Sequence, residues 1–326
     1  MKIAFISEIF QEGKVLSNHP NMRTEFALMH ALDADHFYIH NFVKVREYDH
    51  VFIIFPKGRV YLDACGSKLV EQSNPVSGLL SSNIVEELKK CNKKVYIIQE
   101  GPHWLWNDYE MTDQVLFFNM LISSDGIFAH NEHDTKYYKG MFPSIPVHII
   151  PTLMIDSIVE NIQPVREEKI IIGGNFARWY GGMESFAVAQ RFQVPIWGQT
   201  SHAMREGEDQ LIDHLPRVMW TDWMKQLSSF KYAVHLMPTI AAGTFSLNCA
   251  YFGIPCIGNE KVDTQRLCHP DLAVDVEDVE KAAMLAERLR DDEDFYKECS
   301  RVAKDNYKKH YNKELFVQKI NNIINT

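Results

Sequence analysis

One short segment places several chemically useful side chains directly after an apolar run. Residues 95–106 read VYIIQEGPHWLW, so a carboxylate, Glu100, follows residues that favour a strand. A Gly-Pro turn then leads to His103, Trp104 and Trp106. A carboxylate at the carboxyl end of a parallel strand is well placed for acid–base chemistry on a ligand. We therefore predict Glu100 as a catalytic base, with His103 as the second candidate.

The aromatic rings near this carboxylate could serve the same chemistry. Trp104, Trp106 and Tyr109 would remove water from around Glu100, which makes a carboxylate a stronger base. Flat rings can also stack on a sugar or a nucleobase. Asp108 is a third candidate base. In the alternative, structural interpretation, Glu100 caps the turn and the tryptophans pack in the core.

A second segment, residues 169–182, reads KIIIGGNFARWYGG and joins a strand to a glycine turn. Glycines let the backbone approach a ligand closely, and the N–H groups that follow can bind a phosphate. An ordinary turn is the alternative. The candidate ligand-binding residues here are Gly173, Gly174, Asn175, Phe176 and Arg178.

A third segment, residues 241–260, reads AAGTFSLNCAYFGIPCIGNE, with a glycine turn that opens a helix. Small polar residues on the first turn of a helix suit a diphosphate and a ribose. Ordinary capping by Thr244 is the alternative. The candidates are Gly243, Thr244, Phe245, Ser246 and Asn248.

The surrounding pattern predicts the elements that would position these residues. Continuous apolar runs such as HVFIIF, KVYIIQE and KIIIGG alternate with helical stretches, which indicates parallel sheets covered on both faces. Runs at HFYIHNF and RVMW are also predicted as strands. We expect two doubly wound α/β domains that face a cleft: residues 1–155, a linker at 156–168, residues 169–305, and C-terminal helices at 306–326 that pack back on the first domain.

Composition limits the class of protein. The chain has 326 residues, 46% hydrophobic and 24% charged, with a net charge of −9, as in a soluble globular protein with no surface-wide affinity for nucleic acid. We expect no membrane span and no secretion signal. The six cysteines form no CxxC pair, which favours free thiols in a reducing cytoplasm. The fourteen histidines show no metal-ligand spacing, so no metal is predicted.

Taken in order along the chain, these motifs resemble the two-domain GT-B glycosyltransferases. In detail they are similar to the phage DNA glucosyltransferases, which glycosylate hydroxymethylcytosine in duplex DNA. The similar features are the MKIA start, Tyr48-Asp49 before an apolar strand, the loop from Gly173 to Arg178, and the stretch NEKVDTQR with Asp263, Thr264 and Arg266.

The resemblance implies a UDP-sugar donor bound by the second domain and an acceptor bound by the first. It implies that Glu100 is the base that deprotonates the acceptor hydroxyl. No cofactor and no metal would be required. The charge of the leaving diphosphate would be met by Arg178, by helix N-termini, and by Lys261 or Arg266.

Two positions depart from the family pattern. Asn248 stands where GT-B enzymes commonly place a glutamate on the ribose, and Ile240 stands where retaining enzymes carry a second glutamate. Asparagine can still hydrogen-bond a ribose, but less strongly than a carboxylate. The departures favour transfer with inversion, by direct displacement. The sugar, of glucose or arabinose type, is left open.

The acceptor is the least constrained part of this interpretation. Residues 56–73 offer Lys57, Arg59 and Tyr61, a basic and aromatic loop that could contact DNA. The alternative is a solvated loop, and the negative net charge favours a glycan or a lipid acceptor instead. A nucleotide-sugar epimerase and a non-catalytic binding module also remain open. The pattern predicts no oligomeric state.

Overall fold

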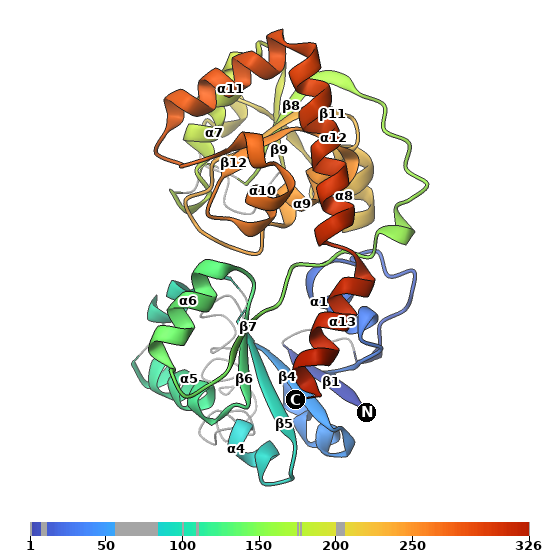
Figure 1. The fold of residues 1–326 in the computed structure, drawn as a ribbon, viewed down its shortest axis with the longest axis vertical. Helices are drawn as coiled ribbons and strands as arrows, with labels where there is room; N and C mark the ends of the chain where they lie inside the picture. Colours follow the sequence, from blue (N-terminus) through green and yellow to red (C-terminus); the bar gives the residue numbers. More distant parts are fainter. Residues whose placement is uncertain are drawn as a thin grey trace. The chain divides into compact units, whose positions relative to one another are not determined.

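The computed structural model describes residues 2–7, 12–55, 84–99, 101–108, 111–174, 176, 178–199 and 206–325. The chain divides into two compact units (Figure 1). Unit 1 comprises Met1–Ser17, Glu25–Pro151 and Val317–Thr326, and unit 2 comprises Asn18–Thr24 and Thr152–Phe316. Each unit is an α/β layer structure built on its own sheet.

The unit boundaries show one feature that the sequence did not indicate. Asn18–Thr24 belongs to unit 2. It is held there by backbone hydrogen bonds: the N–H of Thr24 donates to the carbonyl of Leu153 at 2.9 Å, and the N–H of Thr221 donates to that of Pro20 at 3.0 Å. The stretch expected as a linker, 156–168, also lies in unit 2 and includes a 3-10 turn at Asp156–Ile158.

Unit 1 contains a seven-stranded sheet in the order β2-β3-β1-β4-β5-β6-β7. All neighbouring strands are parallel except β2, which pairs antiparallel with β3 at the edge. The strands are β1 (Ile3–Ser7), β2 (Gly13–Lys14), β3 (Asp35–Tyr38), β4 (His50–Phe55), β5 (Lys94–Gln99), β6 (Gly126–Ala129) and β7 (Val147–Ile149).

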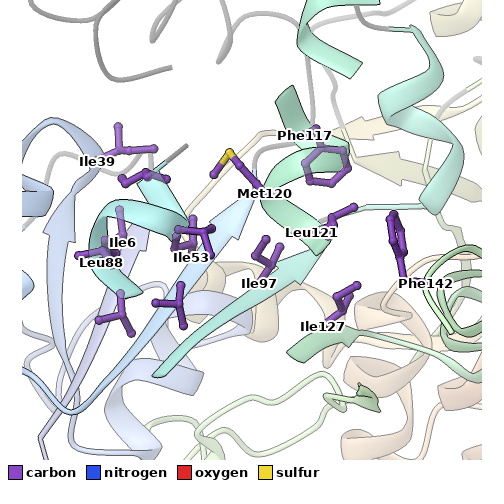
Figure 2. Close-up of a cluster of buried hydrophobic side chains, with 14 of the residues drawn as sticks. Ile6, Ile39, Ile53, Leu88, Ile97, Phe117, Met120, Leu121, Ile127 and Phe142 are labelled. Atoms are coloured by element: carbon purple, nitrogen blue, oxygen red, sulfur yellow. The ribbon is translucent and has the colours of Figure 1, made fainter. Parts of the chain in front are cut away.

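Helices cover this sheet, and alternate side chains fill its two faces. The helices are α1 (Thr24–Ala31), α4 (Ile84–Lys89), α5 (Met111–Ser123) and α6 (Glu132–Met141), with 3-10 segments at Ile39–Glu47 and His103–Asp108. Ile53 and Ile97 pack with Leu121 in one buried cluster (Figure 2). Phe52, one residue from Ile53, points to the other face and stacks on Phe5, with ring centroids 5.0 Å apart.

Unit 2 contains a six-stranded parallel sheet in the order β10-β9-β8-β11-β12-β13. This is the doubly wound order, in which the chain starts in the middle and the direction of winding reverses between the two central strands. The strands are β8 (Glu167–Ile172), β9 (Ile196–Gln199), β10 (Asp213–Leu215), β11 (Phe230–His235), β12 (Cys256–Asn259) and β13 (Ala273–Val274).

The helices of unit 2 follow these strands in turn. They are α7 (Gly182–Ala189), α8 (Trp220–Leu227), α9 (Thr244–Phe252), α10 (Asp263–Cys268), α11 (Val279–Asp291) and α12 (Glu293–His310), and α13 (Lys313–Ile324) continues into unit 1. Apolar residues of β8, β11, α7 and α11 form one core. The two doubly wound α/β units agree with the fold class expected from the sequence.

One predicted strand is wrong, and a second is shorter than predicted. RVMW, residues 217–220, is not a strand, because α8 begins at Trp220 and buries Trp223, Met224 and Leu227 on one helical face. In HFYIHNF the strand ends at Tyr38, and the following residues turn into the 3-10 segment Ile39–Glu47. Among the helices that the structure describes, none has the length and apolarity to cross a membrane.

Candidate functional site

The order of the unit 2 sheet fixes where a ligand is expected. In doubly wound sheets, ligands bind outside the carboxyl ends of the strands at the point where the strand order reverses. In unit 2 this point lies between β8 and β11, which are hydrogen-bonded neighbours. The chain leaves it through two loops: the β8 loop, after Ile172, and the β11 loop, after His235.

Glycines hold the β8 loop directly against the β11 strand end. The N–H of Gly173 donates to the carbonyl of Val234 at 2.8 Å. A Cβ atom on Gly173 would lie 2.5 Å from Cγ of His235, and one on Gly181, whose φ is +62°, would lie 1.9 Å from the carbonyl oxygen of Leu236. Only glycine fits at both places, so the two loops interlock.

Side chains from neighbouring elements fix the β11 loop. The hydroxyl of Ser185 accepts a hydrogen bond from the N–H of Leu236 at 2.9 Å, and the side-chain amide of Asn259 donates to the carbonyl of Met237 at 2.8 Å. The loop ends at Gly243, whose φ is +74°; a Cβ there would lie 1.9 Å from the hydroxyl oxygen of Thr264. That hydroxyl donates to the carbonyl of Gly243 at 2.8 Å.

The N-terminus of α9 follows the β11 loop and therefore lies at this edge of the sheet. Gly243 is the residue before the helix, and no side chain in the described part of the chain caps α9 there. The first N–H groups of a helix have no partner within the helix, and they carry its positive dipole end. Such an uncapped end is suited to an anion such as a phosphate.

Two predicted ligand-binding side chains instead hold the framework. Ser246 and Asn248 are both 3% exposed. The Ser246 hydroxyl lies 2.7 Å from that of Thr264, and the side-chain oxygen of Asn248 accepts from Nε1 of Trp220 at 3.4 Å. Both lie in the buried stretch of α9 that runs from Ser246 to Ala250. Their predicted side-chain contacts to a ligand stay a prediction, and the N–H of Ser246 lies in the first turn of the helix.

The other predicted residues of this site differ in their exposure, and some lie outside the described residues. Thr244 and Phe245 are partly exposed at the start of α9. Phe176 is 9% exposed and belongs to the core, where its ring lies 6.0 Å from that of Phe186. Asn175 and the side chain of Arg178 lie outside the described part of the structure.

The two further cations expected near the diphosphate already have partners. Nζ of Lys261 lies 3.1 Å from a carboxylate oxygen of Asp275, and Arg266 lies 3.3 Å from one of Asp263. Both pairs are on the surface, where an ion pair contributes little and opens readily. Either cation could be recruited by an anionic ligand.

His235, the last residue of β11, is a polar residue of this edge that was not predicted from the sequence. Its ring packs edge-on against Phe245, with centroids 5.0 Å apart. Burial lowers the pKa of His235 to about 4, so the imidazole is neutral at pH 7. The available signal was a polar residue at the carboxyl end of an apolar strand, in YAVHLMP.

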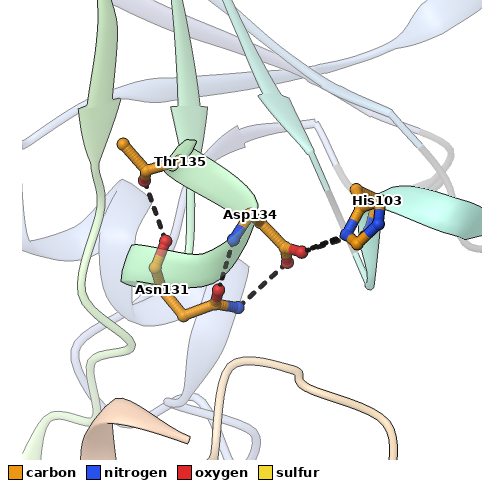
Figure 3. A network of polar contacts seen from close by, with 4 residues as sticks. All are labelled: His103, Asn131, Asp134 and Thr135. Atoms are coloured by element: carbon orange, nitrogen blue, oxygen red, sulfur yellow. Dashed lines mark hydrogen bonds and ion pairs between the residues drawn. The ribbon is translucent and has the colours of Figure 1, made fainter. Parts of the chain in front are cut away.

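Unit 1 contains a second polar group, around the predicted residue His103 (Figure 3). Nδ1 of His103 lies 2.6 Å from one carboxylate oxygen of Asp134. The other oxygen accepts from the side-chain amide of Asn131 at 2.9 Å, and the N–H of Asp134 donates to Asn131 at 2.7 Å, which caps α6. The side chain of Asp134 is 2% exposed and that of His103 is 18% exposed.

This arrangement prepares His103 to accept a proton. A carboxylate accepts the hydrogen bond from Nδ1, so Nε2 carries the lone pair. Tyr137 stacks on the ring at a centroid distance of 4.1 Å and limits its rotation. The same pair, a histidine oriented by a buried aspartate, acts as a general base in many hydrolases and transferases. Asp134 was not anticipated, since it follows His103 by 31 residues and lies on α6.

The other predicted residues of unit 1 have mixed outcomes. Trp106 is 6% exposed and packs edge-on against Phe117 in the core, and its predicted contact to an acceptor stays a prediction. Trp104 is partly exposed. The predictions for Glu100, Tyr109, Lys57, Arg59 and Tyr61 fall outside the described residues.

Among the residues that the structure describes, one group of side chains could hold a metal ion. His103, His133 and Asp134 have ligand atoms within 4.8 Å of one another. Two histidines and a carboxylate are a donor set that zinc accepts. The short contact between His103 and Asp134 already satisfies both groups without an ion. The geometry therefore favours the hydrogen-bonded pair.

Comparison with known proteins identifies the architecture. No protein-family model matches the sequence, and no curated protein sequence matches it. Among solved structures, Anabaena HepE in complex with UDP and glucose has a TM-score of 0.68 at 9% identity, with 100% of each chain covered. An alpha-glucosyltransferase in complex with UDP and a 13-mer DNA containing an HMU base has a TM-score of 0.64 at 10% identity, again with 100% of each chain covered.

TarM of S. aureus, in complex with Fondaparinux, alpha-GlcNAc-glycerol and UDP, has a TM-score of 0.62 at 12% identity. The match covers 87% of this chain and 58% of TarM, so the chain spans little more than half of that protein. All three similar proteins are GT-B glycosyltransferases. Together with the two doubly wound units, these matches show that the chain has the GT-B fold.

Proposed function

We propose that the protein is a glycosyltransferase that binds a UDP-sugar in unit 2 and transfers the sugar to an acceptor hydroxyl bound by unit 1. One observation carries the donor site: the uncapped N-terminus of α9 lies between glycine-fixed loops at the reversal point of the unit 2 sheet. The similar structures of HepE, TarM and the alpha-glucosyltransferase all contain UDP, which supports the same ligand class here.

The proposed donor contacts follow from this geometry. The N–H groups of Thr244 and Phe245 would bind the diphosphate, because they begin the uncapped helix. Arg178, at the end of the β8 loop, would add a full positive charge. Lys261 and Arg266 would contact the diphosphate only after breaking their ion pairs with Asp275 and Asp263.

In the proposed transfer step, the acceptor oxygen attacks the anomeric carbon of the donor sugar. The bond from that carbon to the diphosphate breaks, and UDP leaves with the electron pair. The acceptor proton passes to Nε2 of His103, and Asp134 stabilises the imidazolium that forms. Glu100, the base predicted from the sequence, competes with His103 for this role. A single displacement inverts the anomeric centre.

For the acceptor, we propose a hydroxymethylated pyrimidine in duplex DNA. The alpha-glucosyltransferase of similar fold was solved with DNA that contains an HMU base. The net charge of −9 is the argument for a glycan or lipid acceptor instead. An epimerase would consume UDP-sugar without any acceptor, and a binding module would bind UDP without releasing it from a UDP-sugar.

The deciding experiment measures UDP release from UDP-glucose and a panel of other UDP-sugars, with and without hydroxymethylcytosine duplex DNA. Release that depends on DNA establishes the enzyme and its acceptor together. Duplex DNA with 5-methylcytosine at the same positions is the matched control, because it lacks only the acceptor hydroxyl. DNA-independent turnover, or turnover only with a glycan or a lipid, would refute the DNA acceptor. The anomeric configuration of the product, read by NMR, tests inversion.

A further inference from the structure

His235 is a polar side chain at the proposed donor site, and none of the donor contacts proposed above involves it. It ends β11 at the reversal point of the sheet. Its ring lies between two parts of that site: Gly173 of the β8 loop, and Phe245 in the first turn of α9. The imidazole therefore lies directly against the backbone of Gly173.

The imidazole has no hydrogen-bond partner in the part of the chain that the structure describes. Nε2 is fully enclosed and is unpaired there. Enclosed polar atoms without a partner are rare because each one costs free energy. Because Nε2 is enclosed, a ligand can supply a partner only to the other ring nitrogen, Nδ1.

The orientation of the ring shows which edge a ligand can reach. A Cβ built on Gly173 would lie 2.5 Å from Cγ and 2.7 Å from Cδ2 of His235, so the edge with Cδ2 and Nε2 faces the protein. The residue as a whole remains partly exposed. The accessible edge is therefore the one that carries Nδ1.

We propose that Nδ1–H of His235 donates a hydrogen bond to a phosphate oxygen of the nucleotide-sugar donor. A phosphate oxygen only accepts, so this bond selects the tautomer with hydrogen on Nδ1. The neutral ring implied by its lowered pKa can still donate in this way. The inference rests on the proposed donor site and adds a residue that holds the diphosphate from the sheet side.

The test uses two substitutions of nearly equal shape in the full chain. Asparagine places an amide nitrogen close to the position of Nδ1, whereas leucine fills the same space without a donor. Titration calorimetry with UDP at pH 7.5 should show His235→Leu binding at least roughly tenfold more weakly than wild type, because the lost bond is to a charged phosphate. His235→Asn should stay within about twofold of wild type.

Uridine, which lacks phosphate, separates the phosphate contact from other effects. Its affinity should be the same for the wild type and both variants, which also shows that the site is intact. Equal UDP affinity in His235→Leu would overturn the inference. So would a parallel loss for uridine, or an equal loss in His235→Asn. Those results leave the donor site standing, whereas failure of the wild type to bind UDP removes the proposed function as well.

Discussion

At the residue scale, the chemistry of unit 1 depends on one short contact. His103 and Asp134 meet at 2.6 Å because α6 begins with a capped turn that presents Asp134 toward the segment after β5. Asn131 contributes to both parts of this arrangement, since it caps the helix and donates to the same carboxylate. The aspartate therefore has a fixed position, which is what a residue that orients a base requires.

The first prediction concerns this pair. His103→Ala should lower acceptor-dependent UDP release by about 10²- to 10⁴-fold, the usual contribution of a positioned base. The affinity for UDP should not change, because the donor contacts lie in unit 2. Steady-state kinetics and calorimetry on the same preparation measure the two quantities. If only Glu100→Gln loses transfer, Glu100 is the base and the histidine pair is structural.

His133 decides between a base and a metal site in the same place. It lies within 4.8 Å of both His103 and Asp134 but makes no direct contribution to the proposed proton transfer. We expect His133→Ala to retain activity, and a chelator to have no effect. A loss as large as that of His103→Ala, restored by added zinc, would instead indicate that the three side chains act as metal ligands.

The second prediction tests the cation at the donor site. Arg178→Ala should weaken UDP binding by about 1.5–3 kcal/mol, the scale of a hydrogen bond to a charged group. Calorimetry with UDP measures the loss. The matched control is Arg217→Ala, an arginine of unit 2 that precedes α8. Unchanged affinity in Arg178→Ala would place the diphosphate elsewhere.

Residue types were easier to predict than their surroundings. His103 could be selected from the sequence because it follows a strand and a turn. Asp134 could not, since the contact joins two elements that are distant along the chain. Ser246 and Asn248 were predicted correctly in the first turns of a helix, but their burial depends on packing against Thr264 and Trp220.

At the element scale, the donor site is a set of interlocked turns. Gly173 and Gly181 hold the β8 loop against β11, and Gly243 sets the start of α9 against α10. A side chain at each of these three glycines would collide with a different group: the ring of His235, the carbonyl of Leu236 or the hydroxyl of Thr264. The helix end and the two loops can therefore be placed without any ligand, which lowers the entropic cost of binding.

The third prediction tests this interlocking. Gly243→Ala combines a φ of +74° with a Cβ 1.9 Å from the Thr264 hydroxyl, so it should destabilise the protein by at least about 2 kcal/mol and weaken UDP binding. Gly207 is the matched control: its φ is +80°, but a Cβ there meets nothing within 4 Å. Gly207→Ala should cost only the backbone strain, about 1 kcal/mol. Urea unfolding measures both, and equal losses would contradict the steric argument.

Strand runs and their order along the chain could be predicted because β-branched residues cluster in buried parallel strands. The error at α8 shows the limit of short windows. RVMW alone suits a strand, but the buried residues Trp220, Trp223, Met224 and Leu227 recur with helical spacing. The assignment of Asn18–Thr24 to unit 2 depends on backbone hydrogen bonds that no local pattern contains.

At the scale of the whole molecule, two histidines of unit 2 connect stability with pH. Burial lowers the pKa of both His235 and His269 to about 4. His269 lies behind α9, where its Nε2 is 3.0 Å from the carbonyl oxygen of Ser246. The ordinary pKa of histidine in an unfolded chain is about 6.5. Because the unfolded chain binds protons more readily, stability is complete above about pH 6.5 and falls as the pH decreases toward 4.

The fourth prediction follows from this linkage. Between pH 7.5 and pH 5, each of the two histidines should reduce the free energy of unfolding by about 2 kcal/mol. His269→Gln keeps a donor for the carbonyl of Ser246 but does not titrate, so it should remove about half of this combined loss. Urea unfolding at the two pH values measures this loss of free energy of unfolding, and replacement of the exposed His133 by glutamine is the control.

Carboxylates with lowered pKa values, such as Asp292, reduce stability mainly below pH 5, and they are present in all variants. A pH dependence that is unchanged in His269→Gln would show that this residue is not neutral in the folded protein, and α9 would then be held by an imidazolium rather than by a neutral ring.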